Sequence, residues 1–237
     1  GWWTGLPHRS QKVADAWTHR IERRDMEPRD VHVFVFDGLS DWEAAYAVAG
    51  ISDPQFQRQP GRYRVRTVAP REGSVVTMGG IRIAPDLTLD ALRPADSAML
   101  ILPGGVAWEQ GKHGEAVEMA RAFLKAGVPV AAICGATAGL ARGGLLDDRR
   151  HTSNARDYLA AMKYSGAALY EEAPAVTDRD VITASGLAPL EFAQHIFRRL
   201  DLYRPAVLDA WYQLFKTGRV EHFAAMIRAA GPYDGLL

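Results

Sequence analysis

The run V-P-V-A-A-I-C-G-A-T-A-G-L, residues 128–140, places Cys134 where an apolar strand predicted over 128–133 meets a helix predicted over 136–142. In such a strand-to-helix elbow, the central side chain stands clear of the sheet. It then faces the free N–H groups of the helix, whose field stabilises a thiolate. Free cysteines are more often small buried core residues. The position at an elbow nevertheless favours a nucleophile.

Composition narrows the class of protein. The 237 residues are 48% hydrophobic and carry 28 basic and 28 acidic side chains. A neutral chain without a sustained basic stripe does not indicate a nucleic-acid partner, because such binding depends on neutralising phosphates. No apolar stretch approaches the ~18–20 residues of a membrane span. A single cysteine excludes an intramolecular disulfide. We therefore expect a soluble, cytoplasmic protein with no membrane partner.

Apolar runs alternate with helical patterns along the chain, which is typical of a mostly parallel sheet covered by helices on both faces. A Gly-Gly pair at 79–80 predicts a hairpin between 75–78 and 81–84. Other strands are expected over 31–36, 62–69, 97–102, 128–133, 175–177 and 181–184, and helices over 41–49, before Gly127, over 136–142, 154–164 and 187–200.

Two flanking segments extend this α/β unit of residues 31–200. Residues 1–30 carry Val13, Ala16, Trp17 and Ile21 at helical spacing, which predicts an N-terminal helical extension. Residues 201–237 form a C-terminal extension, with two amphipathic helices within 205–230. Their apolar stripes are expected either to dock on the domain or to contribute to a dimer interface.

Three loops are expected to meet at the carboxyl edge of the sheet, where ligands bind in open α/β folds. The loop after the first strand contains Ser40 and Glu43, whose spacing fits a helix capping box. Glu43 would equally lie near Cys134 and could orient or protonate groups there. After the strand at 97–102, Gly104 and Gly105 offer backbone N–H groups of the kind that an oxyanion hole requires.

The seven histidines form no metal-binding pattern, so we predict no metal and no cofactor. His151 has the most suggestive context, because it opens H-T-S-N shortly after the cysteine helix. It could return towards the thiol or serve a structural role, and the sequence leaves both open.

Four segments together resemble the ThiJ/PfpI superfamily, which has the class I glutamine-amidotransferase-like fold. They are F-D-G-L-S-D-W-E at 36–43, L-P-G-G at 102–105, A-I-C-G-A-T-A-G-L-A-R-G-G-L-L-D at 132–147 and I-T-A-S-G-L-A-P-L-E-F-A at 182–193. The chain is most similar to bacterial members with A-I-C-G-A followed by H-T-x-N. The resemblance implies a flavodoxin-like α/β sandwich, a cysteine at a nucleophile elbow and a frequent homodimer.

Carried over by position, the resemblance implies that Cys134 is the reactive cysteine and Glu43 the acid that contacts its sulfur. Gly104, Gly105 and the N–H of Gly135 correspond to the anion hole. Where relatives carry histidine or tyrosine near the thiol, this chain has Asn154, with His151 three residues earlier. Trp108 is a candidate wall of the pocket.

Departures from the family pattern argue against two of its activities. PfpI-type peptidases have histidine after the cysteine, where this chain has Gly135. Glutamine amidotransferases have a histidine two residues before a late glutamate, where this chain reads Pro189-Leu190-Glu191. Peptidase and glutamine amidotransferase activities are therefore not expected.

The remaining reading is a cysteine-dependent enzyme acting on a small carbonyl, nitrile-like or amide substrate. Glyoxalase-like hydration of an α-oxoaldehyde needs only a thiol and a carboxyl group, and hydrolase-type acyl chemistry is the next choice. Two other classes stay open: a non-enzymatic oxidative-stress or redox sensor that oxidises Cys134, and a scaffold with a vestigial site.

Overall fold

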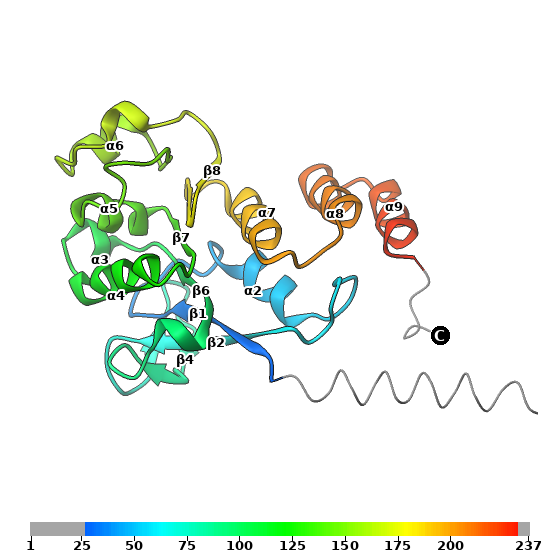
Figure 1. The fold of residues 1–237 in the computed structure, drawn as a ribbon, viewed down its shortest axis with the longest axis horizontal. Helices are drawn as coiled ribbons and strands as arrows, with labels where there is room; N and C mark the ends of the chain where they lie inside the picture. The colour runs from blue at the N-terminus through cyan, green and yellow to red at the C-terminus, as the bar shows by residue number, and fades with distance from the viewer. Residues whose placement is uncertain (1–26, 232–237) are drawn as a thin grey trace, which may run out of the picture.

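The computed structural model describes residues 27–231, which form a central sheet with helices on both faces (Figure 1). Seven strands in the order β5-β2-β1-β6-β7-β9-β8 make up this sheet. All neighbouring pairs are parallel except β8 and β9, which are antiparallel. The predicted mostly parallel α/β sandwich is confirmed. Residues 1–26 of the predicted N-terminal helical extension lie outside the described residues. Of the remaining four positions, 27–28 are irregular and Arg29 and Asp30 begin β1 rather than continuing a helix.

The central strands are apolar because helices cover both of their faces. β6 (Ser97–Leu102) and β7 (Val130–Ile133) are buried at every position, as expected for parallel strands inside an α/β sandwich. The remaining strands of the sheet are β1 (Arg29–Phe34), β2 (Tyr63–Ala69), β5 (Leu87–Thr88), β8 (Ala175–Asp178) and β9 (Val181–Ala184). The short β5 strand was not anticipated.

Helices α3, α4 and α5 lie on one side of the sheet, and α2 and α7 lie on the other (Figure 1). Their bounds are α2 (Ala45–Ser52), α3 (Val106–Glu109), α4 (Gly114–Lys125), α5 (Gly135–Arg142) and α7 (Pro189–Leu200). The short α6 (Arg156–Ala160) follows α5, and two 3-10 turns, η1 (Pro94–Asp96) and η2 (Ala167–Leu169), complete the connections.

The helix expected over 41–49 begins only at Ala45, because a hairpin holds the residues before it in a turn. Strands β3 (Val75–Val76) and β4 (Arg82–Ile83) form this hairpin as predicted. The Asp41 carboxylate accepts hydrogen bonds from the Thr77 hydroxyl and from the Gly79 N–H, the latter at 2.7 Å. These bonds tie the turn at 41–44 to the hairpin, and α2 follows that turn.

The two C-terminal helices are α8 (Pro205–Thr217) and α9 (Glu221–Ala230). α8 docks on the domain: the ring of Trp211 lies 5.0 Å from Phe197 of α7 and 6.2 Å from Tyr46 of α2, measured between centroids. Glu191 Oε1 also accepts hydrogen bonds from Tyr212 (2.8 Å) and Lys216 (2.6 Å). α9 lies on the outer side of α8 (Figure 1). Docking of the first extension helix is therefore confirmed.

None of the helices in residues 27–231 is long and apolar enough to cross a membrane.

Candidate active site

Cys134 occupies the elbow between β7 and α5 in a strained backbone conformation. Its φ and ψ angles are +56° and −124°, a region that side chains other than glycine rarely adopt and that is often found at functional sites. The surrounding structure holds this conformation. The Cys134 N–H donates to Ala184 O of β9 at 3.0 Å, and its carbonyl accepts from both the N–H (3.1 Å) and the hydroxyl (2.6 Å) of Thr137. The half-buried thiol is thus fixed at the carboxyl edge of the sheet.

Glu43 approaches Cys134 from the turn before α2. Its side chain is only 1% exposed, and its Oε2 accepts a 2.6 Å hydrogen bond from the Gly104 N–H. The carboxyl group also contacts the Cys134 thiol and the Ser40 hydroxyl. Burial raises the pKa of Glu43, although these hydrogen bonds oppose the rise. α2 has no side-chain cap, so the capping-box interpretation of Ser40 and Glu43 is wrong and the approach to Cys134 is correct.

The local environment does not favour a free thiolate. Burial raises the pKa of the Cys134 thiol to about 11, and a charged Glu43 beside it would add to the rise. The Asn154 amide and the Gly135 N–H oppose it by donating towards the sulfur. Removal from water outweighs these two hydrogen bonds and opposes the thiolate that the helix N-terminus is expected to stabilise. The Cys134 thiol and the Glu43 carboxyl group are in direct contact, so the charge state of each affects the pKa of the other.

Asn154, rather than His151, reaches the thiol. Its Nδ2 donates to Cys134 Sγ at 3.3 Å, and its Oδ1 accepts from the Gly186 N–H at 2.9 Å. Gly186 lies so close to the sulfur that an added Cβ would stand 2.8 Å from Sγ. The amide thus connects the thiol to the loop after β9.

Replacing Asn154 with alanine is expected to slow the reaction of Cys134 with iodoacetamide at pH 8 by about fivefold. The loss of one hydrogen bond of about 1 kcal/mol to the sulfur raises the pKa of the thiol further. The rate of mass gain on the intact chain measures this effect. An unchanged rate would show that the Asn154 amide does not act on the sulfur.

The glycine N–H groups have separate uses. The Gly104 N–H is bonded to Glu43, so its predicted place in an anion hole is wrong and it positions the acid instead. Within residues 27–231 the Gly105 N–H has no acceptor. It lies beside Gly135, where an added Cβ would stand 3.3 Å from Gly105 N and 2.8 Å from Gly105 O. The unpaired N–H of Gly105 and the N–H of Gly135, which points towards the sulfur, are the groups in the predicted anion hole that do not bond to Glu43.

Comparisons with known proteins agree with this geometry. The DJ-1/PfpI family profile matches residues 29–199. This chain belongs to the DJ-1/PfpI family. This chain is 40% identical over 201 residues to a Bacillus subtilis protein named uncharacterized protease YoaZ. The match covers 84% of this chain and 96% of that protein. The crystal structure of a thiJ/pfpI family protein from Bacillus anthracis superposes with a TM-score of 0.79 at 38% identity, covering 86% of this chain and 98% of that one. Deglycase PfpI of Pyrococcus furiosus is 40% identical over 88 residues, covering 36% of this chain and 53% of that protein.

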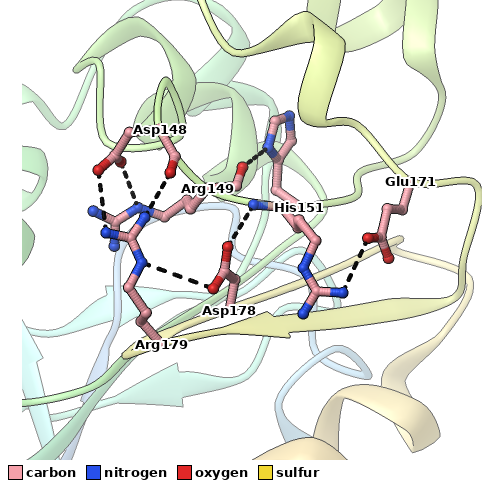
Figure 2. A network of polar contacts seen from close by, with 7 residues as sticks. Asp148, Arg149, His151, Glu171, Asp178 and Arg179 are labelled. Carbon is pink, nitrogen blue, oxygen red and sulfur yellow. Dashed lines mark hydrogen bonds and ion pairs between the residues drawn. The ribbon is translucent and has the colours of Figure 1, made fainter.

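His151 does not serve the thiol in this DJ-1/PfpI protein. Its ring is buried, with Nδ1 2.8 Å from Arg149 O and Nε2 2.7 Å from the Tyr164 hydroxyl. Figure 2 shows the ring beside Arg149, among the ion pairs that surround this turn. Because both ring nitrogens are engaged away from Cys134, the predicted catalytic role is wrong and the structural alternative is correct.

Replacing His151 with alanine is expected to destabilise the DJ-1/PfpI protein by about 2–4 kcal/mol, through two lost hydrogen bonds and a cavity. Cys134 should remain as reactive in the folded fraction as in the unsubstituted protein. Urea unfolding and iodoacetamide alkylation measure the two effects. A loss of thiol reactivity without a loss of stability would restore His151 to the active site.

Trp108 is fully buried, and the small pocket that it lines, between α4 and α5, does not include Cys134. Its Nε1 donates to Pro103 O at 2.9 Å, and its ring packs against Gly139 of α5, so it supports the elbow from behind. The aromatic residue beside the site in this DJ-1/PfpI chain is Trp42, which is 51% exposed and donates from Nε1 to Gly186 O at 3.3 Å. A signal for this contact is present in the sequence, since Trp42 precedes Glu43 and Gly186 follows the strand that pairs with the cysteine strand.

Proposed function

We propose that this chain is a cysteine-dependent enzyme that hydrates small α-oxoaldehydes in a glyoxalase-like reaction. The observation that carries the proposal is the contact between Cys134 and the buried carboxyl group of Glu43 beside the free N–H of Gly105. A thiol, a proton carrier and an oxyanion donor are the groups that this reaction needs.

With methylglyoxal, Cys134 Sγ bonds to the aldehyde carbon while the thiol proton passes to the Glu43 carboxylate. The carbonyl oxygen develops negative charge against the N–H groups of Gly105 and Gly135, and then takes the proton from Glu43. The hemithioacetal so formed loses its C1 proton to Glu43 and the oxygen at C2 takes up the proton of the C1 hydroxyl. Glu43 then returns its proton to C2, and a lactoyl thioester with a hydroxyl group at C2 results. Water cleaves the thioester, releasing lactate and the free thiol. The sum is one α-oxoaldehyde and one water converted to one 2-hydroxy acid.

The partners of Cys134 support this chemistry over peptide hydrolysis. Its polar neighbours are a carboxyl group and the amide of Asn154, and no imidazole contacts the sulfur among residues 27–231. Peptide hydrolysis by cysteine normally uses a histidine to protonate the leaving amine. A relative named a deglycase agrees with aldehyde chemistry, whereas the name of the Bacillus subtilis relative makes peptide cleavage a reasonable comparison assay.

The test is lactate formation from methylglyoxal in buffer without added thiols, with the unsubstituted protein and Cys134→Ala. We expect turnover in the first and none in the second. Lactate from neither protein, with the fold intact by circular dichroism, would reject the proposal.

A second function is favoured by the raised pKa of Glu43. A protonated carboxyl group facing the sulfur can donate a hydrogen bond to a sulfinate, which would stabilise Cys134 oxidised by peroxide. Under this alternative, mild peroxide adds two oxygens to the intact chain and Cys134→Ser abolishes the gain. An inert thiol would remove the redox alternative and leave the enzymatic one untouched.

A further inference from the structure

A cavity lies at the carboxyl edge of the sheet, and its lining does not include the reactive cysteine. Its volume is about 650 Å³, within the range of about 300–1,000 Å³ that holds small-molecule ligands. Neither Cys134, Glu43 nor Asn154 lines it. The floor is formed by side chains that lie in or next to β1, β3, β5 and α4. They are Phe34 of β1, Phe36 just after β1, Val75 of β3, Leu89 just after β5, His113 just before α4 and Ala116 of α4.

The floor is apolar and aromatic, whereas the charges are confined to the rim. Phe34 and Phe36 are buried and their rings lie 5.3 Å apart. The charged residues that line the cavity are exposed and mixed in sign: Asp37, Arg71, Glu72, Lys112 and Glu115. Because these charges nearly balance and face water, they do not select a charged ligand. The floor instead favours a neutral molecule with an aromatic or aliphatic body.

His113 is the polar residue within this apolar floor. Its ring centroid lies 4.3 Å from that of Phe36, 5.2 Å from Phe34 and 4.9 Å from Trp108. Burial, with a smaller contribution from Lys112, lowers the pKa of His113 to about 4, so the ring is neutral at physiological pH. The floor of the cavity therefore carries no charge.

The His113 ring also has an unused hydrogen-bonding atom. Its Nε2 is buried and has no hydrogen-bond partner among residues 27–231. Arg66 Nε is the other such side-chain atom, but it lies 3.5 Å from Asp86. Buried polar atoms are normally satisfied, and each exception calls for a partner. In the neutral tautomer that carries its proton on Nδ1, Nε2 is an acceptor, and a turn of the ring towards the cavity would present it to a donor on a bound molecule.

We propose that this cavity is a second ligand site, for a neutral small molecule with an aromatic or aliphatic body and one hydrogen-bond donor directed at His113. The volume of the cavity, its aromatic floor and the unpartnered nitrogen of His113 together define this class. The proposal does not depend on the reaction at Cys134, since the two sites share no side chain described above as catalytic.

Gly114 offers a way to fill the cavity without disturbing its walls. It lines the cavity at the first residue of α4, its φ is not positive, and an added Cβ would meet no heavy atom within 4 Å. Gly114→Phe should therefore occupy the space that a ligand needs. Lys125→Phe is the matched control, because Lys125 is the exposed last residue of the same helix and does not line the cavity.

The experiment titrates the full chain with indole and with 1-methylindole, which has a similar body without the N–H donor, and follows methyl resonances by NMR. We expect indole to shift the methyl signals of Val75, Leu89 and Ala116 saturably, and 1-methylindole to bind at least fivefold more weakly. His113→Phe should make the two affinities equal. Gly114→Phe should weaken indole binding at least tenfold, whereas Lys125→Phe should leave it unchanged.

Several results would overturn the proposal. They are the absence of saturable shifts with both probes, equal affinity for the two probes in the unsubstituted protein, and unchanged binding in a folded Gly114→Phe variant. If Gly114→Phe fails to fold, Ser74→Trp replaces it as the filling variant, since Ser74 is an exposed lining residue in a loop.

Discussion

Glu43→Gln is expected to lower kcat/KM for methylglyoxal by roughly 10²–10⁴-fold, the usual contribution of a positioned general acid–base. Glutamine keeps an oxygen that can accept the Gly104 N–H bond, so the turn before α2 should stay in place. It cannot exchange protons with the substrate or with Cys134. Steady-state lactate formation measures the effect, and retained activity in this variant alongside its loss in Cys134→Ala would remove Glu43 from the mechanism.

The same substitution is expected to raise the melting temperature at pH 8 and to leave it nearly unchanged at pH 4. Burial raises the pKa of Glu43 above its unfolded value, so the folded state holds the proton more tightly than the unfolded state does. Ionising the group costs the folded state stability as pH rises above the unfolded value, whereas at low pH both states are protonated. A neutral glutamine removes that cost, and stability gained at the expense of activity is common for catalytic groups. Equal melting shifts at both pH values would contradict the raised pKa.

Gly104→Ala is expected to produce the other large effect, a combined loss of activity and stability. An added Cβ would lie 2.6 Å from Glu43 Oε2, 2.7 Å from Cys134 Cβ and 2.9 Å from Gly135 N. Two of these atoms belong to the elbow itself and the third to a buried carboxyl group, so none can move away freely. We expect about 1–3 kcal/mol of destabilisation and at least a 10²-fold loss of activity from misplacement of the pair.

Gly114→Ala is the matched control for this substitution. Its Cβ meets no heavy atom within 4 Å at the start of α4, so it should keep full activity and gain up to about 1 kcal/mol by restricting the unfolded chain. Urea unfolding and lactate formation on both variants provide the comparison. Equal behaviour of the two alanine variants would show that the close approach at Gly104 is relaxed in solution.

Much of the site could be predicted, because alternating strands and helices indicate a parallel sheet, in which the loops that follow the strands meet at one edge. The cysteine strand, the Gly-Gly turn and the Asp37–Glu43 loop all end at one edge of a parallel sheet, which brings Glu43 to Cys134. The choice between His151 and Asn154 could not be made in this way. They lie three residues apart in an irregular segment, and the outcome depends on Tyr164 and Gly186, whose positions are set by tertiary packing.

The direction of the pKa shift of the Cys134 thiol could not be predicted from the sequence for a related reason. The sequence indicates the helix N-terminus behind Cys134 but not how far the sulfur is removed from water, and here burial raises the pKa. The sequence also could not show whether the Trp108 side chain faces the pocket or the core, because a tryptophan after Gly104-Gly105 can point outward or inward. The small residues Gly135 and Gly139 create the space that takes it inward.

Cys134 is the only thiol among 237 residues. The active site can therefore be titrated with a thiol-specific reagent. A thiol-directed electrophile that modifies the chain at cysteine does so at the elbow and nowhere else. The stoichiometry of labelling therefore counts intact reactive centres, and its rate reports how Glu43, Asn154 and Gly186 are arranged around the sulfur. Active-site occupancy can thus be measured in the folded protein before any natural substrate has been identified.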